Sequence, residues 1–132
     1  MTVGYSTALR NARLDAITSA VGTSGLLRIY DGVRPASGGT ATNLLAQLTF
    51  SSVFASPAGS GILTANSIAQ ESSADATGIA TWARITTSGG TFVADLGVGT
   101  AGQGQEVTLN TSNIVSGGVV ACTSLIITAG NP

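Results

Sequence analysis

Residues 79–96 read IATWARITTSGGTFVADL, two stretches rich in β-branched and aromatic side chains on either side of a Ser-Gly-Gly turn. Such side chains favour strands, and glycine tolerates the positive φ angles that tight turns require. The pattern therefore predicts a hairpin with strands over 79–86 and 91–96. Alternation places Trp82 and Arg84 on the same face of the first strand. We expect Trp82 in the core, whereas the charge of Arg84 must pair with an acid, reach a sheet edge or contact a neighbour.

The chain on both sides of this hairpin contains further short strands separated by turn residues. Some are short apolar runs, and others alternate apolar and polar side chains with a period of two, which is typical of a half-buried strand. These predicted strands are Leu26–Tyr30, residues 44–51 and residues 106–110. Residues 119–128 are apolar on both faces, which predicts a central strand. Residues 32–42 and 67–78 are predicted loops.

One helix is predicted ahead of the strands, over residues 6–21. Its apolar side chains at helical spacing are those of Leu14, Ile17 and Val21, with alanines on either side. Ser6 can cap the first turn, and Gly22 can end the helix. Because this apolar face is narrow, the helix can pack closely on a sheet or on a partner.

These patterns together predict an all-β fold, mainly antiparallel, as a single domain over residues 1–132 with an N-terminal helix at about 6–21. Short strands, spaced turns and few helices favour a jelly-roll-like β-sandwich, and an up-and-down barrel is the alternative. A chain of 132 residues buries enough surface to form one core without disulfides.

Charged side chains are sparse, at 8% of the residues with a net charge of −1, and there is neither Lys nor His. The cations are scattered arginines, whereas phosphate binding requires clustered ones, so we expect no nucleic-acid partner. We expect no membrane partner either, because no apolar run approaches the roughly 20 residues that span a bilayer. The first residues lack the basic and apolar regions of a secretion signal, which indicates synthesis in a cytoplasm. A low charge density also gives little protection against self-association.

The residues Gly97-Val-Gly-Thr-Ala-Gly102 match a dinucleotide-binding fingerprint, but their context predicts a loop. The fingerprint requires a helix at its end to hold the pyrophosphate, and an acid about 20 positions further on to bind the ribose. Here a loop and then a strand follow, and no acid lies at that distance.

No other group of residues carries a catalytic or metal-binding signature. Glu71 and Asp75 lie in a Ser-rich loop, where two acids are more often solvated than bound to calcium, which takes about six to eight oxygens. Cys122 lies in an apolar run and has no His to activate it, so we expect a buried thiol. There is no Gly-x-Ser-x-Gly motif and no general base near neutral pH. We therefore expect no enzyme activity, no metal and no cofactor.

Three blocks of the chain resemble a small virion protein that is common in tailed bacteriophages. They are residues 25–50 (GLLRIYDGVRPASGGTATNLLAQLTF), 73–84 (SADATGIATWAR) and 109–118 (LNTSNIVSGG), and the similarity runs from about Leu9 to the end of the chain. Some cement proteins of this size have a jelly-roll fold and bind outside the major capsid shell. The resemblance therefore implies a capsid cement or decoration protein on the virion surface, with the major capsid protein and further copies of itself as partners.

The alternative function is that of a tail component, such as a fibre, an adhesin or a glycan-binding module, since jelly rolls also serve as lectins. The predicted partner-binding residues are Arg10 and Arg13 on the helix and Arg34 in the loop 32–42. Arginine makes paired hydrogen bonds to a carboxylate, and these strengthen where water is excluded. The small alanine face of the helix is the second predicted contact.

Overall fold

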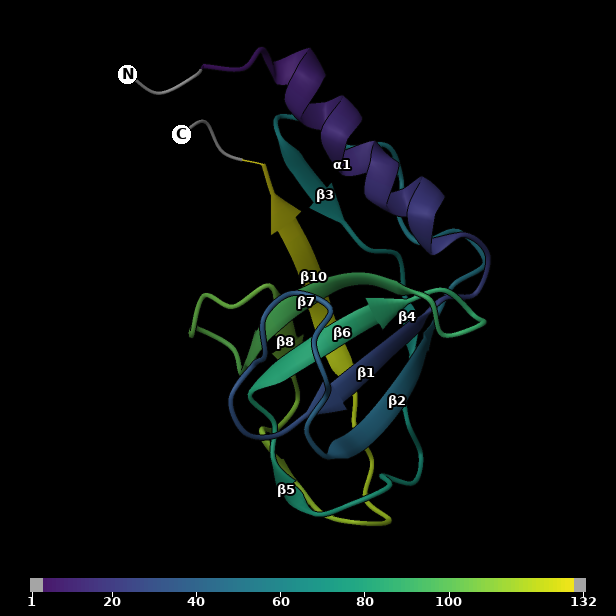
Figure 1. Ribbon diagram of the computed structural model, residues 1–132, viewed down its shortest axis with the longest axis vertical. Helices are drawn as coiled ribbons and strands as arrows, with labels where there is room; N and C mark the ends of the chain where they lie inside the picture. The colour runs from purple at the N-terminus through teal and green to yellow at the C-terminus, as the bar shows by residue number, and fades with distance from the viewer. Residues whose placement is uncertain (1–3, 130–132) are drawn as a thin grey trace.

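The computed structural model describes residues 4–129 and arranges them as one helix beside a strongly curled β-sheet (Figure 1). The elements in chain order are α1 (Thr7–Val21), β1 (Leu26–Tyr30), β2 (Leu44–Phe50), β3 (Ile62–Thr64), β4 (Ile68–Ala69), β5 (Gly78–Ile79), β6 (Trp82–Thr86), β7 (Phe92–Gly99), β8 (Val107–Leu109), β9 (Asn113–Ile114) and β10 (Cys122–Thr128). The fold is therefore mostly β with one helix, which is consistent with a sandwich-like all-β class.

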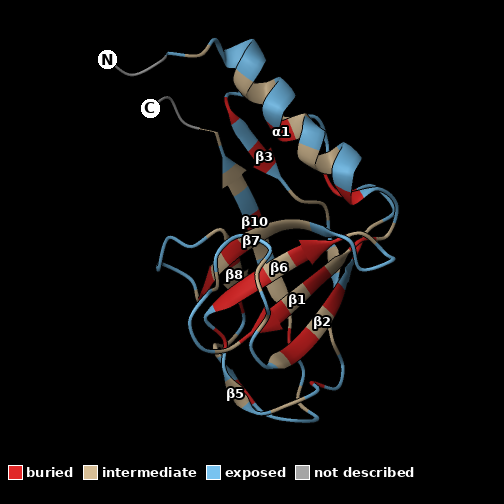
Figure 2. Cartoon of the chain, viewed as in Figure 1, coloured by how far each residue is buried: buried red, intermediate tan, exposed pale blue. Residues whose placement is uncertain are grey.

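Eight of the strands form one mixed sheet in the order β3-β10-β8-β7-β6-β1-β2-β4. β7 and β8 run parallel, and every other pair in this sheet is antiparallel, so the predicted antiparallel pattern is confirmed with one exception. β5 and β9 form a separate two-stranded sheet. Side chains from both ends of the large sheet, such as Leu48 of β2 and Leu125 of β10, belong to one buried cluster. The curled sheet therefore encloses its own core (Figure 2).

The helix α1 begins and ends where the sequence predicts. The Ser6 hydroxyl accepts a hydrogen bond from the Leu9 N–H at 3.1 Å, which satisfies one of the free amides of the first turn. Gly22 ends the helix at φ +71°, a conformation that favours glycine. Of the helical residues, only Leu14 and Val21 are buried. Much of the helix surface is therefore exposed.

The predicted hairpin is confirmed, although its first strand begins later than expected. β6 pairs with β7 along its whole length, and the turn closes with hydrogen bonds from Thr87 to Thr91 at 3.0 Å and from Gly90 to Thr87 at 2.9 Å. Residues 79–86 do not form one strand, because the Ala80 N–H donates to a carbonyl just before β9. This bond directs β5 to β9 and separates it from β6.

The apolar run 119–128 does not form a central strand, and this prediction is wrong. β10 lies between β3 and β8 toward one end of the sheet, and only Leu125 among its residues is buried. Ile126 is 41% exposed, so the outer face of this end of the sheet is open to solvent. The most buried strand is instead β6, in the middle of the sheet, where side chains on both faces are covered.

The outer face of β6 is covered by the loop of residues 32–42. Ala83 and Ile85 belong to the main core, so alternation directs Trp82 and Arg84 to the opposite face. Trp82 is nevertheless only 1% exposed. The predicted burial of this ring is confirmed, but the ring lies in a second layer outside the main core.

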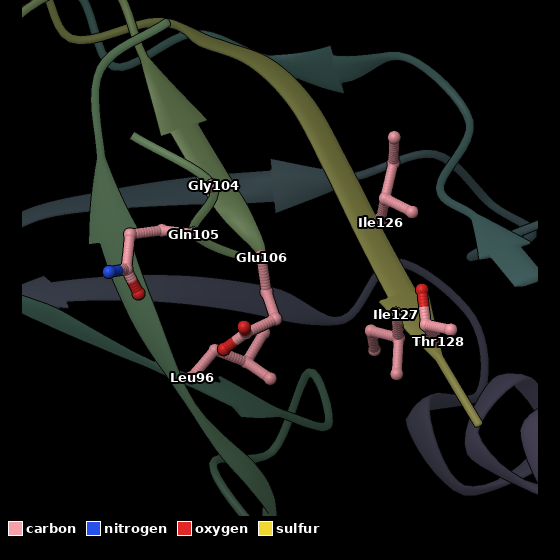
Figure 3. A pocket seen from close by; sticks show the side chains of 7 residues that line it. All are labelled: Leu96, Gly104, Gln105, Glu106, Ile126, Ile127 and Thr128. Atoms are coloured by element: carbon pink, nitrogen blue, oxygen red, sulfur yellow. The ribbon is translucent and has the colours of Figure 1, made fainter. Parts of the chain in front are cut away.

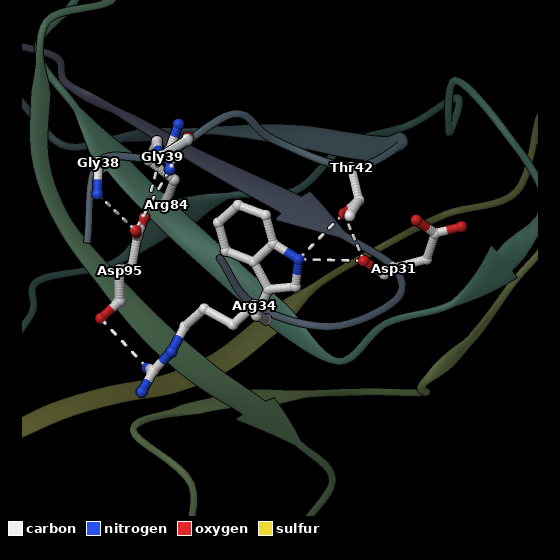
Figure 4. A network of polar contacts seen from close by, with 8 residues as sticks. Asp31, Arg34, Gly38, Gly39, Thr42, Arg84 and Asp95 are labelled. Atoms are coloured by element: carbon white, nitrogen blue, oxygen red, sulfur yellow. Dashed lines mark hydrogen bonds and ion pairs between the residues drawn. The ribbon is translucent and has the colours of Figure 1, made fainter. Parts of the chain in front are cut away.

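Polar contacts, drawn in Figure 4, and an aromatic contact fix the position of Trp82 in this second layer. Its indole Nε1 donates to the Asp31 carbonyl and to the Thr42 hydroxyl, both at 3.0 Å. Its ring stacks on that of Tyr30, with ring centroids 4.4 Å apart. Because the two hydrogen-bonding residues stand at the start and the end of the loop, Trp82 joins both ends of the loop to the sheet.

Replacement of Trp82 by Ala should lower the free energy of unfolding by about 3–5 kcal/mol, as large aromatic truncations in cores do. Trp82→Phe keeps a ring against Tyr30 and should cost less. Chemical denaturation followed by circular dichroism measures both variants, since Trp82 is the only tryptophan and its fluorescence is lost with it. An unchanged midpoint for Trp82→Ala would contradict the buried position.

Candidate interaction surfaces

An ion pair between Arg84 of β6 and Asp95 of β7 holds the loop 32–42 on the sheet (Figure 4). The Arg84 Nε lies 2.8 Å from Asp95 Oδ1, and Arg84 Nη2 donates to Asp95 Oδ2 at 3.2 Å. The same Nη2 donates to the Gly39 carbonyl at 2.8 Å, and the Gly38 N–H donates to Asp95 Oδ2 at 3.1 Å. Of the three alternatives for the Arg84 charge, the structure shows the pairing with an acid, and the pair joins two strands to the loop.

This ion pair is shielded from water, with side-chain exposures of 12% for Arg84 and 3% for Asp95. The pKa of Arg84 is raised above its ordinary value, mainly by the hydrogen bond to Asp95, whereas burial opposes the shift. The guanidinium also lies 5.2 Å from the ring centroids of Trp82 and Phe92, within range of a cation–π attraction. Arg84 is therefore committed to the fold.

Arg10, the first of the predicted partner-binding residues, makes contacts within the chain. Its Nη1 donates to the Ala129 carbonyl and its Nη2 to the Thr7 hydroxyl, each at 3.2 Å. The side chain is partly buried, whereas a residue that binds a partner is expected to be exposed. Arg10 therefore connects α1 to the segment that follows β10.

Arg13 and Arg34, the other two predicted residues, are exposed on separate elements. The Arg13 guanidinium lies 5.0 Å from the ring centroid of Tyr5, beside α1. Arg34 lies in the loop 32–42, and its Nη1 is 3.5 Å from the Asp95 carbonyl oxygen (Figure 4). No described contact joins Arg34 to either arginine of the helix, so the three residues do not form one site.

Arg28 of β1 is a candidate that the sequence analysis did not single out. It lies on the outer face of the sheet, opposite Gln47 of β2 and Arg84 of β6. Within the described part of the chain its side chain makes no hydrogen bond and no ion pair, and its Nε is buried without a partner. The signal was present in Leu26–Tyr30, because alternation places a charge in the middle of this strand on the face away from the core.

The ribbon of β3 and β10 has one covered face and one bare face. Leu63 is 1% exposed on the covered face, whereas Ile62 and Ile126 are 43% and 41% exposed on the other. The register and the alternation of side chains place Thr64 and Thr128 on the same face as these two isoleucines. These four residues (Ile62, Thr64, Ile126 and Thr128), hereafter the bare face, form an uncharged and partly apolar surface.

An open groove of about 500 Å³ adjoins the bare face, where β7 and β10 separate (Figure 3). The short strand β8 pairs with only the last two residues of β7, Val98 and Gly99. The remainder of β7 therefore diverges from β10. Glu106 lies where β7 and β10 begin to separate, and it binds both strands. Its carbonyl accepts a hydrogen bond from the Ile126 N–H, and its Oε1 accepts one from the Gly97 N–H, both at 3.0 Å. The lining residues are Leu96, Gly104, Gln105, Glu106, Ile126, Ile127 and Thr128.

The glycines of the fingerprint-like stretch serve packing, and the predicted loop begins only at Thr100, because residues 97–99 belong to β7. A Cβ at Gly97 would lie 2.1 Å from Gln105 Oε1, and one at Gly99 would lie 2.5 Å from Gln103 Oε1. The Gln103 Oε1 also accepts the Thr100 N–H at 2.9 Å. These glycines therefore let the glutamines of the following loop fold back over β7, and a strand rather than a helix comes next.

Glu71, one of the two acids of the predicted loop 67–78, supports the backbone. The Glu71 carboxylate accepts N–H groups from Ser73 at 3.2 Å and from Gln47 of β2 at 3.4 Å. Across residues 4–129, no group of three or more His, Cys, Asp or Glu side chains is placed to hold a metal ion. Cys122 is partly buried, and burial raises the pKa of its thiol to about 11.

Comparisons with known proteins gave no match to the sequence or the fold. No protein-family model matches the chain, and neither a curated protein nor a solved structure does. The helix in the described residues is too short and too polar to cross a membrane. The surfaces described above are therefore the basis for a functional proposal.

Replacement of Asp95 by Asn should lower the free energy of unfolding by about 3–5 kcal/mol, because Arg84 then keeps a shielded charge without an acid. The double variant Arg84→Gln/Asp95→Asn removes both charges and should be more stable than Asp95→Asn alone. Urea denaturation of the three proteins measures the difference. A loss below about 1 kcal/mol for Asp95→Asn would place the pair among ordinary surface ion pairs.

Alkylation of Cys122 at pH 8 should be about 100-fold slower in the folded protein than in urea, because the raised pKa leaves far less thiolate than a thiol with a pKa of 9.0. The difference should narrow as the pH approaches 11. Mass spectrometry after timed treatment with iodoacetamide measures both rates. Equal rates at pH 8 would show that the thiol is accessible and unperturbed.

Proposed function

We propose that this chain is a structural virion protein of a tailed phage that cements or decorates the outer capsid surface by bridging neighbouring capsid subunits. The observation that carries the proposal is the bare face, where Ile62 and Ile126 are exposed on a surface without charge. Contiguous exposed apolar surface marks sites of protein contact. The resemblance of residues 25–50, 73–84 and 109–118 to virion proteins supports the same function.

A cement protein needs contact surface rather than a chemical site. Copies that bind equivalent positions on one shell gain avidity without new contacts. A ligand that binds the assembled shell, and not its free subunits, stabilises the assembly by mass action. With 8% charged residues, neighbouring copies of this chain repel one another little. The proposed role is therefore structural and requires no catalysis or cofactor.

The proposed contact with the major capsid protein includes the bare face, the exposed side of α1 and the loop 32–42. The helix presents small exposed side chains at Ala12 and Ala16, which allow a partner to approach its backbone closely. Arg13 and Arg34 supply exposed guanidinium groups for partner carboxylates. Arg10 contributes indirectly, because its hydrogen bond to the segment after β10 holds the helix in place.

We also propose that the fold is a jelly-roll-like β-sandwich. Curling of the sheet brings both of its ends into one core, which is how sandwiches and barrels reduce their exposed edges. The eight strands form one continuous sheet. The two separate packed sheets of a jelly roll are therefore a proposal for this chain.

Particles that lack this protein should lose resistance to heat and osmotic shock, and added purified protein should restore it. Ile126→Glu should bind these particles at least about tenfold more weakly, because it places a charge on the bare face. Ile79→Glu is the matched control and should bind normally, since Ile79 is 60% exposed in β5, at the other end of the molecule from α1 (Figure 1). Co-sedimentation with particles measures binding.

A different result would favour the tail function. If particles without the protein resist heat and osmotic shock as wild-type particles do, but fail to adsorb to cells, the cement function is wrong. A fibre, adhesin or glycan-binding role then takes its place.

A further inference from the structure

Arg28 is the one arginine for which the described residues provide no partner. Arg10 and Arg34 donate to carbonyl groups, Arg13 lies over an aromatic ring, and Arg84 pairs with Asp95. Arg28 has none of these contacts, although its side chain is partly buried and its Nε is fully so. A guanidinium that is partly removed from water without a hydrogen-bond acceptor is destabilising.

The surroundings of Arg28 favour a carboxylate as the missing partner. Arg84 stands directly opposite on β6, and like charges in this position repel each other. Asp95, the acid nearest in the register, already binds Arg84 with both of its oxygens. An additional carboxylate on this face would neutralise the charge of Arg28 and accept hydrogen bonds from its free N–H groups.

Among the acids of the chain, one residue has a carboxylate that is free to serve as this partner. Asp15, Asp31, Glu71, Asp95 and Glu106 each accept a hydrogen bond within the chain. The Asp75 carboxylate is exposed and has no described partner. Among the described residues, Arg28 is thus the one arginine and Asp75 the one acid whose side chain has no described polar or ring contact.

The backbone holds Asp75 firmly in place. Its N–H donates to the Leu45 carbonyl of β2 at 2.8 Å. The neighbouring Ala74 exchanges hydrogen bonds with Gly117 and Gly118, both at 2.9 Å. The carboxylate therefore stands on a fixed segment beside β2, and Val119, at 49% exposed, offers apolar contact area on the adjoining segment.

We propose that Arg28 of one copy of this chain binds Asp75 of a second copy in a two-fold symmetric dimer. Arg28 lies opposite Gln47 of β2, and Asp75 is bonded to Leu45 of the same strand, so both residues flank β2. Two copies that meet across this part of the sheet form the pair twice, since a two-fold interface brings each residue to its counterpart. The inference deepens the proposed function and rests on it, because the resemblance to cement proteins implies further copies of the chain as partners.

Charge reversal tests this contact sharply. Arg28→Asp and Asp75→Arg each place like charges at both pairs of the dimer, so each variant alone should dimerise at least about tenfold more weakly than wild type. An equimolar mixture of the two variants should dimerise again, because the mixed dimer forms one pair with the original polarity and the other with reversed polarity. Ala101→Asp, in the exposed loop after β7, controls for added negative charge and should dimerise as wild type.

Sedimentation equilibrium at low ionic strength measures these associations, and circular dichroism confirms that each variant is folded. A monomeric wild type, or dimerisation unchanged in both single variants, would overturn the proposal. So would a mixture that stays monomeric while the double variant Arg28→Asp/Asp75→Arg behaves as wild type, since the pair would then form within one chain. These measurements use no particles, so the dimer and the cement function can fail independently.

Discussion

The ion pair between Arg84 and Asp95 is the contact on which the outer layer of the molecule depends. It joins β6 to β7 and, through Gly38 and Gly39, fixes the middle of the loop that covers Trp82. Without this pair Gly38 and Gly39 would lose their hydrogen bonds to the sheet, and the indole would gain access to water. A chain with so few charges thus uses a single shielded pair, the only salt bridge among its described residues, to cover the centre of its sheet.

Local signals predicted the parts of the fold that depend on neighbouring residues in the chain. The cap at Ser6, the hairpin of β6 and β7, and the shared face of Trp82 and Arg84 follow from spacing and alternation. The run 119–128 was misplaced because apolar side chains on both faces of a strand do not reveal whether a second layer covers them. That depends on which strand comes alongside, and β3, the neighbour of β10, lies some 60 residues earlier in the chain.

The candidate contact residues were predicted less well, for a related reason. Sequence identifies an arginine but not the acceptor that reaches it from a distant segment. Arg10 was expected to be free and donates to the carbonyl of Ala129, whereas Arg28 was overlooked and has no partner among residues 4–129. The bare face was also hidden, because Ile62 and Ile126 share a surface only through the register of β3 with β10.

The pairing of β3 with β10 also sets the order in which parts of the molecule can fold during synthesis. During synthesis α1 and β3 emerge long before β10, yet β3 has its strand partner in β10, and Arg10 of the helix binds the residue that follows it. The hairpin of β6 and β7 needs only local pairing and can form on the ribosome, whereas the β3 ribbon must wait for the last strand. Nascent chains therefore carry an unpaired apolar strand through about the second half of translation. A cell that makes many copies at once has to keep these strands from joining one another.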